Sequence, residues 1–275
     1  MDLKNFGART LITIIFGPLI LLSAWQGGYI FFALTASIVI LAMNEFYDLA
    51  AQKLTYPARF IGIGTGITLC FLLFLNLSQN LWILFSGAFF ILVIYELFRN
   101  EVAPILNIAT TLMGIFFVAF LLGFLILIRQ LPYQLDLEYK EGGNWIILMF
   151  LSIWVCDSAA YIVGARFGKH KLFERVSPNK TIEGTLFGFV FALITAYLCY
   201  LTFIKQIDLI NALVIGAICG SVGQVSDLVE SLFKRDAQVK DSSNILPGHG
   251  GILDRFDSEI LVAPAIYFYL RFIVY

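Results

Sequence analysis

The run ILNIATTLMGIFFVAFLLGFLILI, residues 105–128, decides the fold class because its 24 residues include no charged side chain. A helix needs roughly 20 mainly apolar residues to cross the hydrocarbon core of a bilayer. Strands of a membrane barrel alternate polar and apolar side chains over only about ten positions. This run is longer and unbroken, so it predicts a transmembrane helix.

Eight further apolar runs flank this one, and together they predict an all-α polytopic membrane protein with about nine transmembrane helices. The predicted spans are 10–25, 28–46, 60–77, 81–97, 105–128, 145–163, 185–204, 209–233 and 260–275. The composition agrees, because 60% of the 275 residues are hydrophobic and only 13% are charged, against about 25% charged in soluble domains. The first span follows basic residues as a signal peptide does. It lacks a small-residue cleavage site and a second span follows at once, so we expect it to be retained.

The two halves of the chain differ in what they carry. Residues 1–144 are predicted to form an N-terminal region of about five plain apolar spans. Residues 145–275 are predicted to form a catalytic region of four spans, whose polar loops 166–183 and 234–259 build a cavity facing the cytoplasm. The net charge of −1 gives no basic field for nucleic acid, so none is expected as a partner.

The distribution of basic residues predicts the orientation. With nine spans, 14 of the 18 Lys and Arg residues fall on the face that holds the N-terminus and both polar loops, and four fall on the other. Basic loops stay in the cytoplasm. We therefore expect a multi-pass protein of the cytoplasmic (inner) membrane, with its N-terminus and active site facing the cytoplasm.

Acidic residues within the spans are the first candidates for chemistry. Asp157 lies in the sixth span, and Asp227 and Glu230 lie in the eighth. A carboxylate at the bilayer centre costs about 2.5–3.5 kcal/mol on insertion scales, so each needs a partner. A structural ion pair, or a position near the interface, stays open as the alternative to a functional role.

The eighth span carries these acids on one side. Asp227, Glu230 or Ser231, and Lys234 recur at helical spacing and form a polar stripe toward the cytoplasmic end. Gly216 and Gly220 precede the stripe at a spacing that lets another helix approach closely. The span is therefore predicted to be an inner helix with a polar face.

The loop after this span is rich in glycine and charge. Gly248, Gly250 and Gly251 allow positive φ and close approach of backbone N–H groups to an anion. Asp254 and Asp257, three residues apart, share a face if a helix begins there. Carboxylates beside cations suit Mg²⁺ and phosphates. A mixed-charge surface loop is the simpler alternative.

The loop after the sixth span offers a second place to hold phosphate. Lys180 supplies a cation, and Ser177, Asn179 and Thr181 can donate hydrogen bonds near a helix N-terminus. Ser177 or Thr181 can instead simply cap that helix, with the proline after Ser177 near its first turn. His170 stands in a basic run and is interpreted as solvated rather than catalytic.

The stretch 231–257 resembles the signature of the phosphatidate cytidylyltransferases (CDP-diacylglycerol synthases), and 157–169 and 177–184 are similar to further motifs of that family. The resemblance covers roughly residues 150–275. It implies a multispanning enzyme that makes CDP-diacylglycerol and pyrophosphate from CTP and phosphatidate with Mg²⁺ as cofactor. CTP, the phosphatidate lipid and the bilayer are therefore the expected partners, and a homodimer packed through the glycine-rich spans is compatible with the sequence.

The resemblance assigns a role to each candidate residue. Asp227 and Asp254 are the expected metal ligands, and Asp257 a third acid beside them. The cations expected to neutralise phosphate are Lys234, Arg235, Lys240 and Arg255. Gly250 and Gly251 would cradle the CTP phosphates, to which His249 would donate. The remaining expected substrate-binding residues are Ser177, Asn179, Lys180, Thr181, Glu183, Asp241 and Asp157.

Two rival functions use the same residues. A CTP-dependent polyprenol kinase would combine similar parts with an alcohol acceptor. An ion-coupled transporter would use Asp157, Asp227 and Glu230, but transporters usually carry paired repeats, and the chain has no second copy of the His-Gly-Gly loop.

Overall fold

The computed structural model describes residues 3–53, 55–245 and 250–275, with side chains from residue 15 onward. Two compact units make up the chain. The first consists of Met1–Ser23, Gly27–Leu127 and Asp236–Phe256, and the second of Ala24–Gln26, Ile128–Arg235 and Asp257–Tyr275. The chain thus leaves the first unit and returns to it for the polar segment after residue 235. The division predicted near residue 144 on functional grounds stays a prediction.

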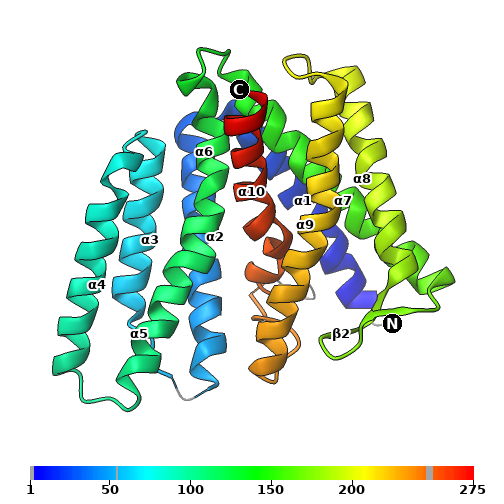
Figure 1. Cartoon of the computed structure of the whole chain (residues 1–275). Helices are drawn as coiled ribbons and strands as arrows, with labels where there is room; N and C mark the ends of the chain where they lie inside the picture. Colours follow the sequence, from blue (N-terminus) through cyan, green and yellow to red (C-terminus); the bar gives the residue numbers. More distant parts are fainter. Residues whose placement is uncertain (1–2, 54, 246–249) are drawn as a thin grey trace. The chain divides into compact units, whose positions relative to one another are not determined.

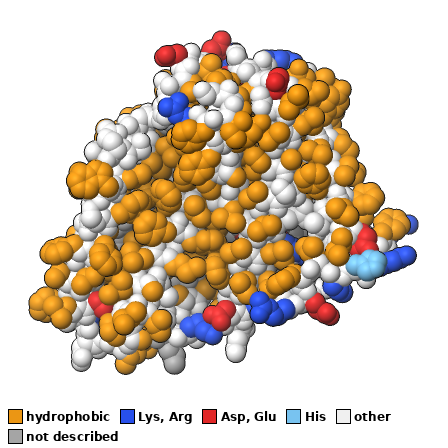
Figure 2. All heavy atoms as spheres, viewed as in Figure 1, with side chains coloured by type: hydrophobic (Ala, Val, Ile, Leu, Met, Phe, Trp, Pro, Cys, Tyr) orange, Lys and Arg blue, Asp and Glu red, His pale blue; other side chains and the backbone are white. Residues whose placement is uncertain are grey.

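The prediction of a helical membrane protein is confirmed for its class, but the count of nine spans is not. Within the described residues six helices are long and apolar enough to cross a bilayer: Gly28–Ala51, Ser78–Phe98, Pro104–Gln134, Lys140–Phe167, Ile182–Thr202 and Leu209–Asp236. Two shorter apolar helices, Ile15–Gln26 and Arg59–Phe74, fall in the first and third predicted spans. Hydrophobic side chains cover most of the face drawn in Figure 2, and charged ones gather along two edges.

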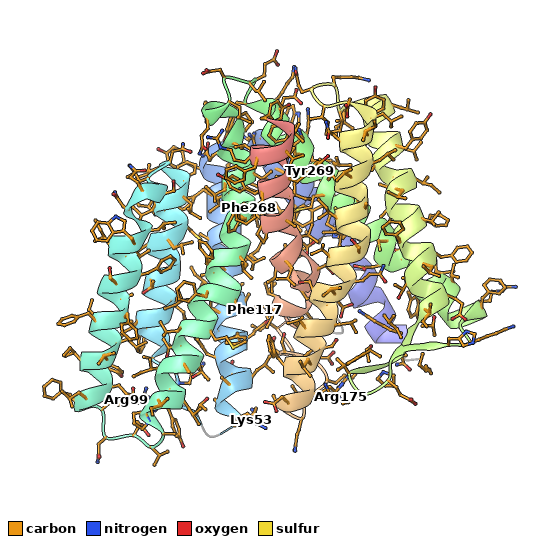
Figure 3. All side chains as sticks on the ribbon, in the orientation of Figure 1. Lys53, Arg99, Phe117, Arg175, Phe268 and Tyr269 are labelled. Atoms are coloured by element: carbon orange, nitrogen blue, oxygen red, sulfur yellow. The ribbon has the colours of Figure 1, made fainter. Side chains whose placement is uncertain are left out.

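Helices of the first unit are drawn from blue to green in Figure 1. They are α1 (Leu3–Gln26), α2 (Gly28–Ala51), α3 (Arg59–Phe74), η1 (Ser78–Asn80), α4 (Leu81–Phe98), α5 (Pro104–Met113), η2 (Gly114–Phe120) and the start of α6 (Leu121–Gln134). The segment η2 is a π-helical stretch inside one long apolar helix. Lys53 and Arg99, which follow α2 and α4, extend from the same end of this unit (Figure 3).

Close packing in the first unit centres on the buried ring of Tyr47 in α2. A Cβ atom at Gly62 of α3 would lie 2.8 Å from Tyr47 Cζ, and one at Gly114 of η2 would lie 2.6 Å from the same atom. Neither position therefore has room for a side chain. The Tyr47 hydroxyl donates to the Thr111 carbonyl at 3.0 Å, which satisfies its buried polar group.

The second unit combines helices with a small hairpin. Its elements are the remainder of α6, α7 (Lys140–Phe167), β1 (Lys171–Phe173), β2 (Ser177–Thr181), α8 (Ile182–Thr202), α9 (Leu209–Asp236), α10 (Asp257–Tyr269) and η4 (Leu270–Val274). The two strands pair antiparallel. This hairpin is an addition to the predicted all-α fold, in which residues 166–183 were expected to form a polar loop.

Glycines let three helices of the second unit approach one another. A Cβ atom at Gly184 of α8 would lie 2.6 Å from the Ala160 carbonyl oxygen of α7, which leaves no space for it. Between α8 and α9, a Cβ atom at Gly216 of α9 would lie 2.6 Å from Ala196 Cβ, and one at Gly220 would lie 3.0 Å from Phe189 Cα. The predicted close approach through Gly216 and Gly220 is confirmed, and α7, α8 and α9 lie side by side (Figure 1).

Helix α6 continues past residue 128, the predicted end of its span, and the next residue is a buried arginine. Arg129 is 2% exposed. Its Nε donates to the Ala24 carbonyl at 2.8 Å, and one terminal nitrogen donates to the Tyr139 carbonyl at 2.6 Å. The guanidinium also lies over the Tyr139 ring, 3.8 Å from its centroid. The protein itself therefore supplies acceptors for the buried charge inside the helix, which ends at Gln134.

Candidate active site

The polar stripe of α9 is present and is built of ion pairs. Lys234 and Glu230, one helical turn apart, form a salt bridge with an Nζ–Oε2 distance of 2.5 Å. Glu230 is 0% exposed and Lys234 is 8% exposed. Asp227 accepts a hydrogen bond from the Ser231 hydroxyl at 3.3 Å and forms an ion pair with Lys180 of β2. The acids of the stripe are therefore paired with two lysines, one on the same helix and one on the hairpin.

The Lys180–Asp227 pair joins two motifs that are 47 residues apart in the sequence. Lys180 was predicted to bind phosphate and Asp227 to bind metal, and the structure places each beside the other. About a quarter of each side chain is exposed, at 27% and 26%. Both side chains are therefore partly open to solvent, and the phosphate contact of Lys180 stays a prediction.

The hairpin is fixed to its surroundings by several hydrogen bonds. Thr181 is the N-cap of α8 and accepts from Gly184 N at 3.2 Å, so one of the two predicted capping residues is confirmed. Ser177 lies in β2, four residues earlier, and the proline after it is in the strand rather than in the first turn of the helix. That local prediction was wrong, because strand pairing extends Ser177–Thr181. Asn179 is exposed.

Glu183 and Arg235 act in the structure as anchors for this hairpin. Glu183 accepts from the backbone N–H groups of Lys169 at 3.1 Å and His170 at 3.2 Å. His170 Nδ1 lies 2.6 Å from the same carboxylate, so the exposed imidazole has a specific partner as well as solvent. Arg235 Nε donates to the Val176 carbonyl at 3.2 Å. Their roles toward substrate stay predictions.

Asp257 is the first residue of α10, and four other acidic residues of the second unit lie near it. The carboxylates of Asp157, Asp227, Glu230 and Glu259 all interact electrostatically with that of Asp257. The start of α10 is tied to α9 because the hydroxyl of Ser226 donates to the Asp257 carbonyl. The acids predicted in the sixth and eighth spans therefore lie near Asp257.

The loop of residues 237–252 belongs to the first unit and ends in the short 3₁₀ helix η3, Leu253–Arg255. Gly250 has φ of +82°, as its glycine predicts, and Lys240, Asp241 and Arg255 are exposed. Gly248 and His249 lie outside the described residues. Asp254 is buried at 8% exposure. Its Oδ2 accepts from Gly251 N at 2.7 Å and from the backbone and hydroxyl of Ser242, each at 2.9 Å.

One residue that holds this loop was missed by the sequence analysis. Glu45 of α2 is 1% exposed and accepts hydrogen bonds from the loop at 2.6–2.9 Å. It lies inside the predicted span 28–46, so the criterion that identified Asp157 also applies to it. The first half of the chain was interpreted as plain apolar helix, and Glu45 was overlooked for that reason.

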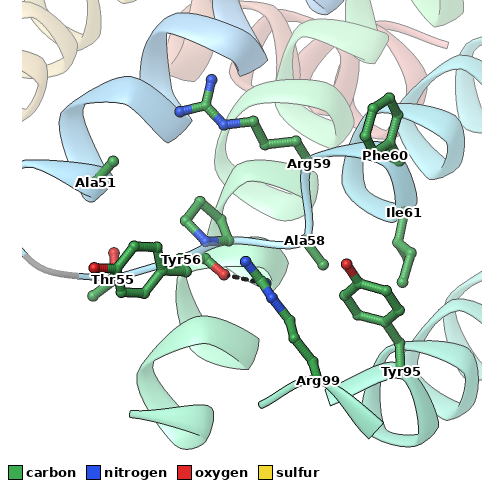
Figure 4. A pocket seen from close by; sticks show the side chains of 10 residues that line it. Ala51, Thr55, Tyr56, Ala58, Arg59, Phe60, Ile61, Tyr95 and Arg99 are labelled. Atoms are coloured by element: carbon green, nitrogen blue, oxygen red, sulfur yellow. Dashed lines mark hydrogen bonds between the residues drawn. The ribbon is translucent and has the colours of Figure 1, made fainter. Parts of the chain in front are cut away.

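A cavity of about 290 Å³ opens in the first unit, away from the predicted residues. Figure 4 shows Tyr56, Tyr95 and Arg99 around it. Arg99 donates to the Tyr56 carbonyl at 2.6 Å, and Asn107 holds the same link by accepting from Tyr56 N at 2.7 Å. Arg99 also lies 3.7 Å from the buried carboxylate of Glu96, so its charge is already compensated.

The donor set suits Mg²⁺, although within the described ranges no three His, Cys, Asp or Glu side chains form a metal-binding group. Mg²⁺ is usually held by one or two carboxylates, with waters and substrate phosphates completing its shell. Asp227 lies in the second unit and Asp254 in the first. Each offers carboxylate oxygen of the right chemistry, and their joint role as ligands stays a prediction.

A polytopic helical fold whose apolar helices contain ion pairs is typical of membrane proteins that handle charged substrates. The sequence comparisons assign the family. The cytidylyltransferase family model matches residues 7–273, so the chain belongs to the cytidylyltransferase family. The expected resemblance is confirmed, and family membership favours an enzyme over the ion-coupled transporter.

Relatives named phosphatidate cytidylyltransferase match most of the chain. The protein from Synechocystis sp. is 33% identical over 270 residues, which cover 89% of each chain. The one from Staphylococcus saprophyticus is 34% identical, with 92% of this chain and 93% of the relative covered. A Bacillus subtilis protein of the same name reaches 49% identity over 131 residues, about half of each chain.

Proposed function

We propose that the chain is a Mg²⁺-dependent membrane nucleotidyltransferase that makes CDP-diacylglycerol and pyrophosphate from CTP and phosphatidate. A phosphate oxygen of phosphatidate attacks the α-phosphorus of CTP, the new P–O bond forms, and the bond to the β-phosphate breaks to release pyrophosphate. Family membership across residues 7–273 carries this proposal. The ion-paired stripe on α9 supports it, since the reaction brings two polyanions together.

The attacking phosphate needs no activating base, because it is already an anion at neutral pH. The main barrier is electrostatic repulsion, and placed cations lower it. Lys180 and Lys234 are the proposed phosphate contacts in the second unit, and Lys240 and Arg255 in the first. Lys180 and Lys234 each have a carboxylate partner in the structure, which keeps the charges compensated before substrate arrives.

Asp227 and Asp254 are the proposed ligands of Mg²⁺, with Asp257 nearby in the sequence. Bound there, Mg²⁺ would supply positive charge that offsets the phosphates and stabilises the leaving pyrophosphate. The acyl chains of phosphatidate would stay in the bilayer. We further propose that the chain lies in the cytoplasmic membrane with the N-terminus and the loop of residues 237–252 in the cytoplasm.

Purified protein in lipid nanodiscs, supplied with labelled CTP and Mg²⁺, tests the reaction. We expect label to enter lipid only when phosphatidate is present, with one pyrophosphate released for each labelled lipid. Parallel reactions with a polyprenol, or with no acceptor, separate the rivals. Phosphoryl transfer to the polyprenol without labelled CDP-lipid would instead establish the kinase, and no turnover with any acceptor would refute the nucleotidyltransferase.

The matched variants are Lys180→Ala and Lys171→Ala. Both lysines come from the hairpin, but Lys171 Nζ donates to the Pro178 carbonyl at 2.6 Å and has no proposed contact with substrate. We expect Lys180→Ala alone to reduce kcat/KM. Equal losses in both variants would mean that only the hairpin's stability matters.

A further inference from the structure

The carboxylate of Glu45 is surrounded by hydrogen-bond donors from one short stretch of chain. Its Oε1 accepts from the Ser243 hydroxyl at 2.6 Å and from Ile252 N at 2.9 Å. Its Oε2 accepts from the Ser242 hydroxyl at 2.9 Å and from Leu253 N at 2.7 Å. The partners are about 200 residues away in the sequence, so this single side chain ties α2 to the segment that carries the C-terminal motif.

A second carboxylate, that of Asp254, belongs to the same segment and also accepts hydrogen bonds from it. Asp254 Oδ2 and Glu45 Oε2 each lie 2.9 Å from the Ser242 hydroxyl, which has one proton to donate to either. A Cβ atom at Gly251 would overlap both the Ser242 hydroxyl and Glu45 Oε2. The fold therefore requires glycine at 251 for a steric reason, and it packs the backbone directly against the Glu45 carboxylate.

The geometry requires a charged acceptor with two equivalent oxygens. Each oxygen of Glu45 receives one backbone N–H, Oε1 also receives the Ser243 hydroxyl, and Oε2 shares the Ser242 hydroxyl with Asp254. Glutamine has the same shape, but one end is an NH₂ group that would face a backbone N–H. One buried donor, at Ile252 or Leu253, would then lose its acceptor, which is costly away from water.

We propose that Glu45 is a positioning residue for the transfer reaction, which fixes the chain at residues 242–243 and 252–253 so that neighbouring Lys240 and Arg255 can contact substrate phosphate. The inference rests on the proposed function. Glu45 touches no reacting atom itself and acts through the loop. It gives helix α2 a part in the reaction beyond its apolar packing.

The test compares Glu45→Gln with Glu96→Gln in the full-length protein in nanodiscs. Glu96 is a matched control because it is also a buried acid of the first unit, 5% exposed, and its carboxylate accepts from Asn107 Nδ2 at 2.6 Å rather than from the loop. Four quantities are measured: kcat for the reaction, KM for CTP, the melting temperature, and backbone hydrogen exchange in a peptide covering residues 250–255.

We expect Glu45→Gln to accelerate exchange in that peptide about tenfold and to lower kcat/KM by about tenfold or more per folded molecule, since a buried donor loses its acceptor. Glu96→Gln should leave both at the wild-type level. Glu45→Asp, which keeps the charge on a shorter side chain, should recover part of the loss. Ser243→Ala removes one donor only, so it should shift exchange in the same direction by less, and it serves if Glu45→Gln fails to fold.

Hydrogen exchange separates this inference from the proposed function, because it needs no turnover. If wild-type protein makes no CDP-lipid, the proposed function fails, and the exchange result still decides whether Glu45 orders the loop. Wild-type exchange and wild-type kcat/KM in Glu45→Gln would overturn the proposal. So would a lowered melting temperature with unchanged activity per folded molecule, which is the result expected of a purely structural acid.

Discussion

Replacing Lys180 with alanine removes the cation that the structure pairs with Asp227, and it distinguishes a phosphate contact from a structural ion pair. If Lys180 exchanges Asp227 for a phosphate when substrate binds, the variant loses a charge contact in both the bound and the transition state. Such a contact gives uniform binding, so the loss should be found in kcat/KM, through a raised KM.

The magnitude follows from the burial of the pair. Two unit charges about 4 Å apart interact by about 4 kcal/mol at an effective dielectric constant of about 20. Lys180 must give up Asp227 to reach phosphate, which offsets part of the gain and leaves about 1.5–3 kcal/mol, as for other hydrogen bonds to charged groups. At about 1.4 kcal/mol per factor of ten, kcat/KM for CTP should fall about 10- to 150-fold.

The assay is initial-rate formation of labelled CDP-lipid over a range of CTP concentrations, with Lys180→Ala, Asp227→Asn, the double variant and the charge swap Lys180→Asp with Asp227→Lys. The swap restores an ion pair but places the positive charge on α9 instead of the hairpin. We expect it to stay inactive. Recovery of wild-type kcat/KM by the swap, or wild-type kinetics in Lys180→Ala, would refute the phosphate contact and leave only the pair.

Three further predictions follow from the same residues. Asp227→Asn and Asp254→Asn should each raise the half-saturating Mg²⁺ concentration or abolish activity. The losses in the double variant should be non-additive. An unchanged Mg²⁺ requirement in active Asp227→Asn protein contradicts the assignment of Asp227 as a ligand. A cysteine placed at exposed Asn244 should react with an impermeant label only from the cytoplasm, and a cysteine at Lys205 only from outside. The four native cysteines are buried and should not react. Labelling of both positions from one side contradicts the orientation. Gly251→Ala should displace the loop and lower both activity and melting temperature, because its Cβ has no space; a wild-type melting temperature would show that the segment can move aside.

Local pattern was sufficient for much of the fold. Unbroken apolar runs predicted the long helices, and the spacing of Asp227, Glu230 and Lys234 predicted a polar face on α9. The positive φ of Gly250 also follows from its residue type. These features depend on neighbours within a turn or two, which a sequence displays directly.

Contacts between distant segments were not accessible in the same way. Glu45 meets its loop across about 200 residues, and no spacing rule links them. Lys180 likewise meets Asp227 across 47 residues, and the hairpin that carries Lys180 was not predicted. The count of nine spans is not confirmed within the described residues, in part because α3 has only 16 residues, so that the apolar run predicted there is divided between a short helix and its connections.

Arg129 has a consequence for the packing of the end of α6. The carbonyl oxygens of Ala24 and Trp25 that receive its guanidinium are synthesised about a hundred residues before it, whereas the carbonyl oxygen of Tyr139 follows ten residues later. Its acceptors therefore come from both sides of α6 in the sequence, from the end of α1 and from the residue before α7. The guanidinium has its full set of acceptors only when both of these segments lie against α6, so the packing of the end of α6 depends on both.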